Sequence, residues 1–399
     1  MEATKKAKPS CGDAISNLPD DLLCRILSSL STKEAALTSV LSKRWSNLLL
    51  SIPIFDFDDT VFLNPQKGRR KNVFFKAFVD RLLSLRVETS SPVQRVSLKC
   101  RQGGVAPDCI TKWILTTILL AFPSLQSLRI HESNEWKFWN GSASSTRTLK
   151  SLVYRRDSDC CAPKPCVSFD TPSLVYLEYT DVVADKYENL KLDSLVEAKI
   201  DFNLTAFQIM RKPNSSGFVS GDVTTFFKAI RNVKILCLSP DALEALYYRG
   251  KMIPVFNNLR SLSLGSDKPH GSTFIFWKLL PSMLNNSPNL ETLIIKGLVH
   301  YVAKGWEDLR PISRLCFSWD DVSASFSSSA VEVLEITRYK GTCQEVNKMK
   351  HFLGKLSRLQ MVKVHHKAVN DEEKSRLMKD VLLLPKASKC KIQFMKETV

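Results

Sequence analysis

PSLQSLRI at residues 123–130, PSLVYLEY at 172–179 and PNLETLII at 288–295 are three copies of one sequence pattern. Each copy has leucine at its first apolar position, leucine three residues later, and an aliphatic residue or tyrosine two residues after that. Five further copies, some with other aliphatic residues, lie between residues 93 and 264, and successive copies start 21 to 38 residues apart. The last two apolar positions alternate with polar ones, which is typical of a short strand that buries one face.

No single strand of this kind can bury its own apolar face, so neighbouring copies are expected to stack. The pattern predicts an α/β fold, namely an irregular leucine-rich-repeat solenoid with a parallel sheet on its concave side, over residues 60–310. The segments 99–121 and 265–287 are long enough to hold helices. The alternative is a two-layer α/β domain whose strands are leucine-rich by coincidence, and the number of copies favours the solenoid.

Side chains beside the buried leucines are predicted to face the concave surface and to bind a target. The set consists of Arg129, His131, Arg155, Tyr176, Glu178, Lys199, Asp201 and Lys296. Both signs of charge are present, whereas a nucleic-acid surface would show a basic stripe with stacking aromatic residues. The pattern therefore favours a target protein or a small ligand over nucleic acid.

The N-terminal sixty residues predict three short helices. Pro19, with the two aspartates that follow it, indicates a first helix whose apolar residues at 22, 23, 26, 27 and 30 share one face. Ser31 and Glu34 form a capping box for a second helix, and Ser42 can cap a third. Three such helices bury little area, so the unit either needs a partner or is an ordinary helical cap on the next domain.

Residues 15–59 resemble an F-box. The resemblance lies in the run LPDDLL at 18–23, the pair Ile26-Leu27, the run KEA at 33–35, the run VLSKRW at 40–45 and the acidic end DFDD at 56–59. The sequence departs from the family at Ser31, where proline is usual, and at Leu49, where tryptophan is common. The resemblance implies docking onto the Skp-family adaptor of a Skp–cullin–F-box ubiquitin ligase, and through it onto cullin. The implied adaptor contacts are Leu18, Pro19, Leu22, Leu23, Ile26, Leu27, Val40, Leu41 and Trp45.

The C-terminal ninety residues predict the order strand, helix, strand, helix, strand, which would cap the solenoid. This stretch resembles the FBD domain of plant proteins in VLEI at 333–336, in YKG at 339–341 and in the run from DEEK at 371–374 to LPKAS at 384–388. The chain is thereby identified as a member of the plant F-box/FBD/leucine-rich-repeat family. We expect a disordered tail over 1–12, the F-box over 13–59, repeats over 60–310 and an FBD domain over 311–399.

Composition limits the remaining functions. The chain has 399 residues, a formal net charge of +17 and 11 cysteines without a CxxC pair, so neither a zinc site nor another cofactor is expected. The N-terminus lacks an apolar core, and no apolar run approaches the roughly 20 residues that span a bilayer. We expect a cytoplasmic or nuclear protein without a membrane partner. Short basic runs at 5–8 and 67–71 are solvated loops or nuclear import signals.

The expected function is that of a non-catalytic substrate receptor, because none of the nucleotide-binding, metalloprotease or hydrolase motifs is present. His365 and His366 are interpreted as a surface pair. The alternative is a repeat-based binding scaffold or small-ligand receptor without a ligase role. The target, the particular adaptor, any ligand or phosphate on the concave surface, the oligomeric state and the role of Cys160, Cys161 and Cys166 are not determined by the sequence.

Overall fold

The computed structural model describes residues 15, 17–62, 73–89, 92–100, 105–114, 122–132, 147–156, 163–205, 208, 221–265, 273–297, 328–367 and 370–397. The chain divides into two compact units, Met1–Arg129 and Ile130–Val399. Both basic runs, at 5–8 and 67–71, and the pair Cys160 and Cys161 lie outside the described residues.

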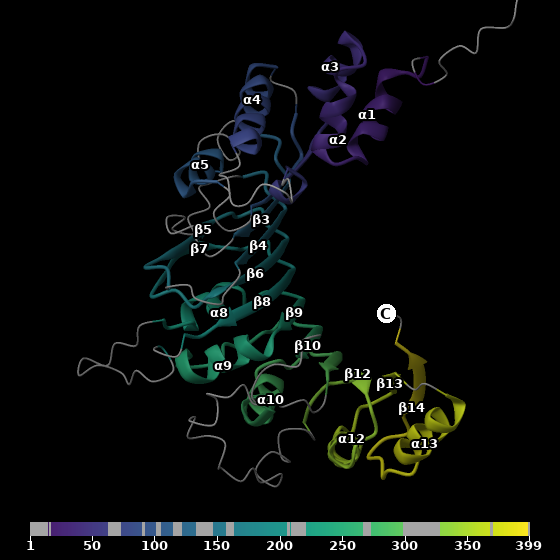
Figure 1. Cartoon of the computed structure of the whole chain (residues 1–399). Helices are drawn as coiled ribbons and strands as arrows, with labels where there is room; N and C mark the ends of the chain where they lie inside the picture. Colours follow the sequence, from purple (N-terminus) through teal and green to yellow (C-terminus); the bar gives the residue numbers. More distant parts are fainter. Residues whose placement is uncertain are drawn as a thin grey trace, which may run out of the picture. The chain divides into compact units, whose positions relative to one another are not determined.

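The first unit begins with three helices that pack on one another (Figure 1). Their bounds are Asp20–Ser28 for α1, Thr32–Thr38 for α2 and Lys43–Leu49 for α3. The predicted caps are confirmed: Ser31 Oγ accepts from the amide of Glu34, whose carboxylate accepts from the Ser31 amide at 3.0 Å. Ser42 Oγ accepts from the amide of Trp45 at 3.4 Å. Ser31, at the position where the F-box family usually has proline, therefore starts α2 by capping it.

The first unit continues with strands and helices that follow the three-helix cluster. They are β1 Ile54–Asp58, the 3-10 turn η1 Asp59–Phe62, α4 Val73–Thr89, β2 Arg95–Lys99 and α5 Pro107–Lys112, and β3 Ser127–Glu132 lies at the unit boundary. Strand β1 pairs in parallel with β2. Its residues had been assigned to the acidic end of the F-box, but Phe55 and Phe57 alternate with Asp56 and are fully buried. The Asp56 amide donates to Thr32 Oγ1 at 2.7 Å, which ties this strand to α2.

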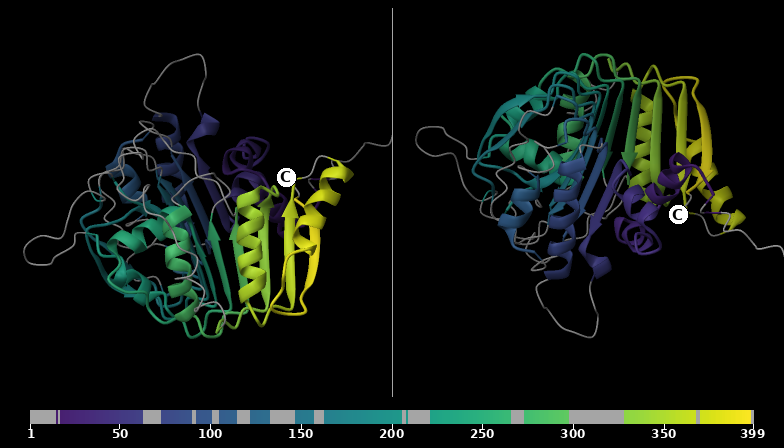
Figure 2. Two further views of the ribbon diagram at one scale, coloured as in Figure 1. Left: turned by 90° about the horizontal axis from the view of Figure 1, so that it is seen from below. Right: turned by 90° about the horizontal axis from the view of Figure 1, so that it is seen from above.

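The second unit contains a parallel sheet whose strands follow one another in chain order (Figure 2). The strands are β4 Ser151–Arg156, β6 Tyr176–Val182, β8 Glu197–Asn203, β9 Ile235–Leu238, β10 Ser261–Gly265, β11 Thr292–Lys296, β12 Val333–Tyr339, β13 Met361–His366 and β14 Lys391–Lys396. The register aligns the pattern's second apolar position across neighbours, for example Leu236 with Leu262 and Leu262 with Leu293. The predicted parallel sheet of stacked repeats is therefore confirmed.

Helices and a small second sheet complete this unit. Helices α8 Thr224–Ala229, α9 Pro240–Arg249, α10 Thr273–Asn285, α12 Cys343–Lys355 and α13 Asp371–Leu382 follow strands of the large sheet, and β5 Val167–Asp170 pairs in parallel with β7 Tyr187–Lys191. The helix expected within 265–287 is confirmed as α10. The predicted C-terminal order is also confirmed, as β12, α12, β13, α13 and β14. Elements β5, β7, α8 and α9 were not predicted.

Asparagine side chains join neighbouring repeats just before the strands. The Asn289 amide nitrogen donates to the Asn257 carbonyl at 2.8 Å, and that of Asn258 donates to the Asn232 carbonyl at 3.4 Å. These bonds satisfy carbonyl groups in the turns that lead into β9 and β10. They fix the offset between successive repeats.

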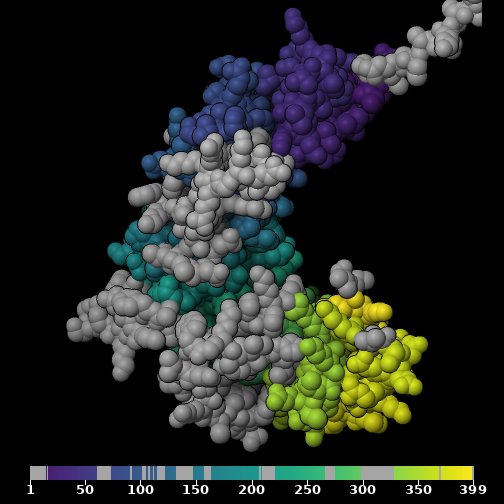
Figure 3. Space-filling view, viewed as in Figure 1, coloured from purple at the N-terminus to yellow at the C-terminus, as the bar shows by residue number. Residues whose placement is uncertain are grey.

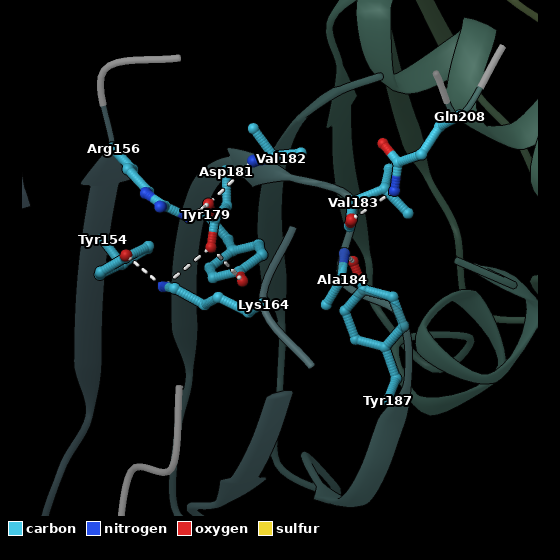
Figure 4. Close-up of polar contacts among 10 residues, drawn as sticks. All are labelled: Tyr154, Arg156, Lys164, Tyr179, Asp181, Val182, Val183, Ala184, Tyr187 and Gln208. Carbon is cyan, nitrogen blue, oxygen red and sulfur yellow. Dashed lines mark hydrogen bonds and ion pairs between the residues drawn. The ribbon is translucent and has the colours of Figure 1, made fainter. Parts of the chain in front are cut away.

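A buried ion cluster lies between β4 and β6 (Figure 4). The Asp181 carboxylate, which is fully buried, lies 3.2 Å from the Arg156 guanidinium and 2.9 Å from Lys164 Nζ. It also accepts from Tyr179 Oη at 2.9 Å and from the Val182 amide at 2.8 Å. Removing one partner from such a cluster leaves a buried charge uncompensated, which costs about 3–5 kcal/mol.

The histidine pair of β13 differs from the sequence interpretation. His366 is buried, and His365 is half-buried with Nε2 3.1 Å from a Glu335 carboxylate oxygen. The interpretation as a surface pair was wrong, because the strand continues through both residues and packs one side chain on each face. Burial lowers the pKa of His366, with Lys374 and Lys396 acting in the same direction, so the imidazole is neutral near pH 7.

Candidate functional site

Helix α1 carries one broad apolar arc. Leu23 and Leu27 are buried in the three-helix core, whereas Leu22 and Ile26 on the helix, and Leu30 just after it, are exposed. Leu22 and Ile26 are four residues apart, so they form one stripe along the outer side of the helix. The four leucine and isoleucine residues within α1 share one face as predicted, but a core this small covers only half of the apolar arc.

A second group of exposed apolar side chains follows on α2 and the turn before α3. Leu37 is exposed, and Val40 and Leu41 are 82% and 68% exposed. We call Leu22, Ile26, Leu30, Leu37, Val40 and Leu41 together the F-box surface; the helices that carry it are purple in the space-filling view (Figure 3). Six aliphatic side chains left in water within twenty residues are unusual for a finished surface and typical of an interaction site.

The nine predicted adaptor contacts separate by burial. Leu22, Ile26, Val40, Leu41 and Pro19 are exposed, and Leu18 is half-buried. Leu23, Leu27 and Trp45 lie in the core, where a partner cannot reach them without unfolding the helices. These three side chains hold the cluster together, and the outer residues remain the candidate contacts.

Arg44 fixes the entrance to α1. Its guanidinium lies 2.6 Å from the Asp20 carboxylate and donates to the Leu18 carbonyl at 2.6 Å. This connects the start of α3 to the start of α1, across 24 residues of chain. The pair is exposed and adds little stability, but it orients the run at 18–23 that carries the beginning of the outer stripe.

A hollow of about 490 Å³ lies on the other candidate surface, the face of the sheet that carries Glu178 and Lys199. Strands β4, β6, β8, β9, β10 and β11 contribute to its wall, together with His131 and Ser239. It is lined by His131, Arg155, Arg156, Glu178, Thr180, Lys199, Ile200, Asp201, Cys237, Leu238, Ser239, Ser263, Gly265 and Lys296. Six of the eight predicted target contacts lie in this wall, and Arg129 and Tyr176 do not.

Strand register explains why the hollow forms. One row across the sheet runs from Glu178 through Lys199 and Cys237 to Ser263, and the next pairs Thr180 with Asp201 and Gly265 with Lys296. The Ser239 amide bonds to the Ile200 carbonyl, which places Ser239 beside Asp201 in the second row. The middle of both rows therefore consists of small side chains, and long charged ones stand on either side.

Gly265 is required at the floor of the hollow. Its φ is +110°, and a Cβ at this position would lie 2.5 Å from the Lys296 carbonyl oxygen. A side chain here would both strain the backbone and fill the floor. The floor residues were missed by sequence reasoning, although a signal existed: only the copies around 236 and 262 carry small residues on both sides of their last leucine.

Most charges in the wall are paired inside the chain. Arg155 Nε donates to Glu178 at 2.6 Å, Tyr176 Oη donates to Glu178 at 2.9 Å, and Lys199 Nζ lies 3.3 Å from Glu197. Partial burial opposes the charged form of Lys199, but contacts with Tyr176 and Glu197 prevail and raise its pKa. Burial raises the pKa of the Cys237 thiol, so it is protonated at neutral pH.

Comparison with known proteins identifies relatives of this chain. The F-box domain model matches residues 15–57. The chain is 67% identical to the F-box protein At3g59150 of Arabidopsis thaliana, with 100% of both chains covered. It is 33% identical to the F-box/LRR-repeat protein At2g42730 of the same plant, covering 96% of this chain and 97% of the relative.

The chain belongs to the plant F-box/LRR-repeat family. A third relative, the putative F-box/LRR-repeat protein At3g59230 of Arabidopsis thaliana, is 31% identical over 99% of this chain and 97% of its own. The recognition of the F-box from residues 15–59 is thus confirmed, and so is the assignment of the chain to plant F-box proteins with repeats. The FBD resemblance of the C-terminal region stays a prediction.

Two further features of this F-box/LRR protein concern metals and membranes. Within the described ranges, no three His, Cys, Asp or Glu side chains come close enough together to hold a metal ion. No helix among these residues is both long enough and apolar enough to cross a bilayer.

Proposed function

We propose that this F-box/LRR protein is the substrate-recognition subunit of a Skp–cullin–F-box ubiquitin ligase. The observation that carries the proposal is the F-box surface, a set of apolar side chains on α1, on α2 and in the turn before α3 that the described residues leave uncovered. Membership of the family supports the same conclusion.

Docking of the adaptor would proceed by helix packing. Leu22, Ile26, Val40 and Leu41 act as apolar anchors, with Leu18 and Pro19 at the entrance to α1. Each anchor that moves from water into an apolar groove contributes about 1.5–3 kcal/mol. Leu23, Leu27 and Trp45 contribute indirectly, because they hold α1 and α3 in the arrangement that presents the anchors.

The repeats would hold the target on the face of the sheet that contains the hollow, with His131, Arg155, Glu178, Lys199, Asp201 and Lys296 as contacts. Arg129 and Tyr176 remain proposed contacts outside the hollow. In this role the chain makes and breaks no bond. It acts by proximity, raising the local concentration of a target lysine near the activated ubiquitin. We further propose that it works in the cytoplasm or nucleus and that residues 311–399 cap the repeats of 60–310.

Co-expression with a Skp-family adaptor, followed by size-exclusion chromatography, tests the docking half. The wild-type chain is expected to elute as a stoichiometric complex. Replacing Leu22 and Ile26 by aspartate should weaken binding by at least about 100-fold, because two anchors become charges that must be desolvated. Leu383→Asp is the matched control, since Leu383 directly follows α13, is 82% exposed and lies outside the F-box.

Circular dichroism of each variant shows whether the helices persist, because Leu22 and Ile26 are exposed and their replacement should leave the fold intact. Unchanged adaptor binding by the double variant would contradict the docking proposal. A wild-type chain that ignores the adaptor would instead favour a repeat-based binding scaffold or small-ligand receptor without a ligase role.

A further inference from the structure

The described residues do not satisfy all the charges of the hollow. Arg155 is paired with Glu178, Lys199 with Glu197, and Arg156 with Asp181. Lys296, half-buried at the end of β11, forms no ion pair with any residue in the described ranges. Lys296 is therefore a cation in the wall whose counter-charge has to come from outside these residues.

Asp201 is the complementary group on the opposite side of the floor. It lies at the fifth position of β8, and its Oδ1 is enclosed without a hydrogen-bond donor from the described part of the chain. A buried carboxylate oxygen without a donor is costly, and rotation about the terminal side-chain bond can turn either oxygen towards the hollow. A ligand that brings a donor, above all a cationic one, would remove this cost.

The register fixes the spacing of the two charges. Asp201 and Lys296 belong to the same row, with Ser239 and Gly265 between them. Three steps between strands separate their backbones by about 14 Å. Because both side chains can lean over the small floor, the charged groups themselves can be nearer. An extended peptide advances about 3.3 Å per residue, so side chains two to four residues apart match this span.

We propose that the hollow binds an extended segment of the target protein that carries an acidic side chain for Lys296 and a basic side chain, two to four residues away, for Asp201. This inference rests on the proposed function, because it names what the receptor recognises. The small floor residues Cys237, Ser239, Ser263 and Gly265 leave room for the segment's backbone, and the volume is in the range of ligand pockets. A phosphate polymer fits poorly, since Glu178 and Asp201 would repel it.

Fluorescence anisotropy with defined peptides tests the proposal. The probes are labelled ten-residue peptides of glycine and serine with one Glu and one Lys, placed one to six residues apart in either order. Analogues with Gln in place of either charge serve as controls. The protein is the full chain in complex with a Skp-family adaptor, at an ionic strength of about 0.15 M. Peptides with a spacing of two to four are expected to bind at least about tenfold more tightly than their Gln analogues.

Variants assign each charge to its partner. Lys296→Gln should abolish the dependence on the peptide's Glu and keep that on its Lys, and Asp201→Asn should do the reverse. In the doubly reversed variant, Lys296→Glu with Asp201→Lys, the two sites exchange charges. This variant should therefore prefer the order of Glu and Lys in the peptide that is opposite to the order preferred by the wild type. Lys350→Gln, an exposed lysine on α12, is the matched control and should change nothing.

Three results would overturn the inference: no detectable binding of any peptide, affinities that follow only the net charge of the peptide, or variants that keep the wild-type preference. Displacement of the peptides by free 6-aminohexanoate at equal concentration would also do so, in favour of a small zwitterionic ligand. If the peptide prediction fails while the chain still binds the adaptor, the ligase proposal is unaffected. The converse result, peptide selectivity without adaptor binding, would indicate a repeat-based binding scaffold that recognises its target through the same hollow.

Discussion

Lys348 lies in an environment that disfavours its charged side chain. It lies on α12 with 9% of its surface exposed, and its ammonium is 4.9 Å from the centre of the Trp277 ring on α10. Burial lowers its pKa to about 8, although Glu345 acts in the opposite direction. The chain therefore holds a lysine whose charged form is less favourable in the fold than in the unfolded state.

This environment predicts how stability depends on pH. Between pH 8 and 10.5 the unfolded state holds a proton at Lys348 that the folded state has lost, so the free energy of unfolding rises with pH in this window. Below pH 8 both states are protonated and the full penalty applies. Lys348→Met should therefore raise the free energy of unfolding at pH 7 by about 1–3 kcal/mol, after loss of the contact with Trp277.

Urea denaturation of both proteins between pH 7 and 10 measures this difference, which should shrink as pH rises. Lys350→Met, on the exposed side of the same helix, is the control and should give no pH-dependent difference. Parallel pH curves for wild type and Lys348→Met would show that Lys348 titrates normally in the fold.

The repeat strands show at the scale of elements what the sequence could predict. The spacing of leucines is local, and each strand has one face that must be buried, so eight copies sufficed to place eight strands of the large sheet, namely β2, β3, β4, β6, β8, β9, β10 and β11. The outer stripe of α1 was not separable from its inner face, because residues 22 and 23 both fall within one apolar arc. Only the size of the core decides which of them is covered.

The hollow shows what could not be predicted. Most charged residues of its wall were predicted, each from the pattern of its own strand, and these residues do lie in the hollow. Its floor depends on which residues of β8, β9 and β10 lie side by side, and this register is set by loops whose lengths vary. Strand β1 was missed for a related reason, since two phenylalanines that alternate with aspartates reveal a strand only when β2 pairs with them.

Adjacent positions on β11 test the register directly. Leu293 is buried against Leu262 and Leu334, whereas Ile294 lies half-buried on the open face beside Ser263 and Glu335. Leu293→Ala should lower the free energy of unfolding by about 2–5 kcal/mol, because it leaves a cavity in the core. Ile294→Ala, the matched substitution, should cost about 1 kcal/mol or less. Denaturant titrations that rank the two in the opposite order would mean a slip of one residue, which exchanges the faces.

At the scale of the whole molecule, net charge and exposed apolar surface have opposite effects on self-association. The net charge of +17 keeps copies of the chain apart at low salt. The F-box surface draws them together, because Leu37, Val40 and Leu41 are covered by nothing within the described residues. Salt screens the repulsion between charges and leaves the apolar attraction in place.

The chain without its adaptor should therefore associate more strongly as salt increases, as measured by sedimentation velocity at ionic strengths from about 0.05 to 1 M. Replacing Leu37, Val40 and Leu41 by serine should keep it monomeric at every salt concentration, and adaptor binding should do the same for the wild type by covering the surface. The C-terminal control Leu383→Ser should still associate. Association that weakens with salt would instead point to contacts between opposite charges, and it would place the self-association site outside the F-box surface.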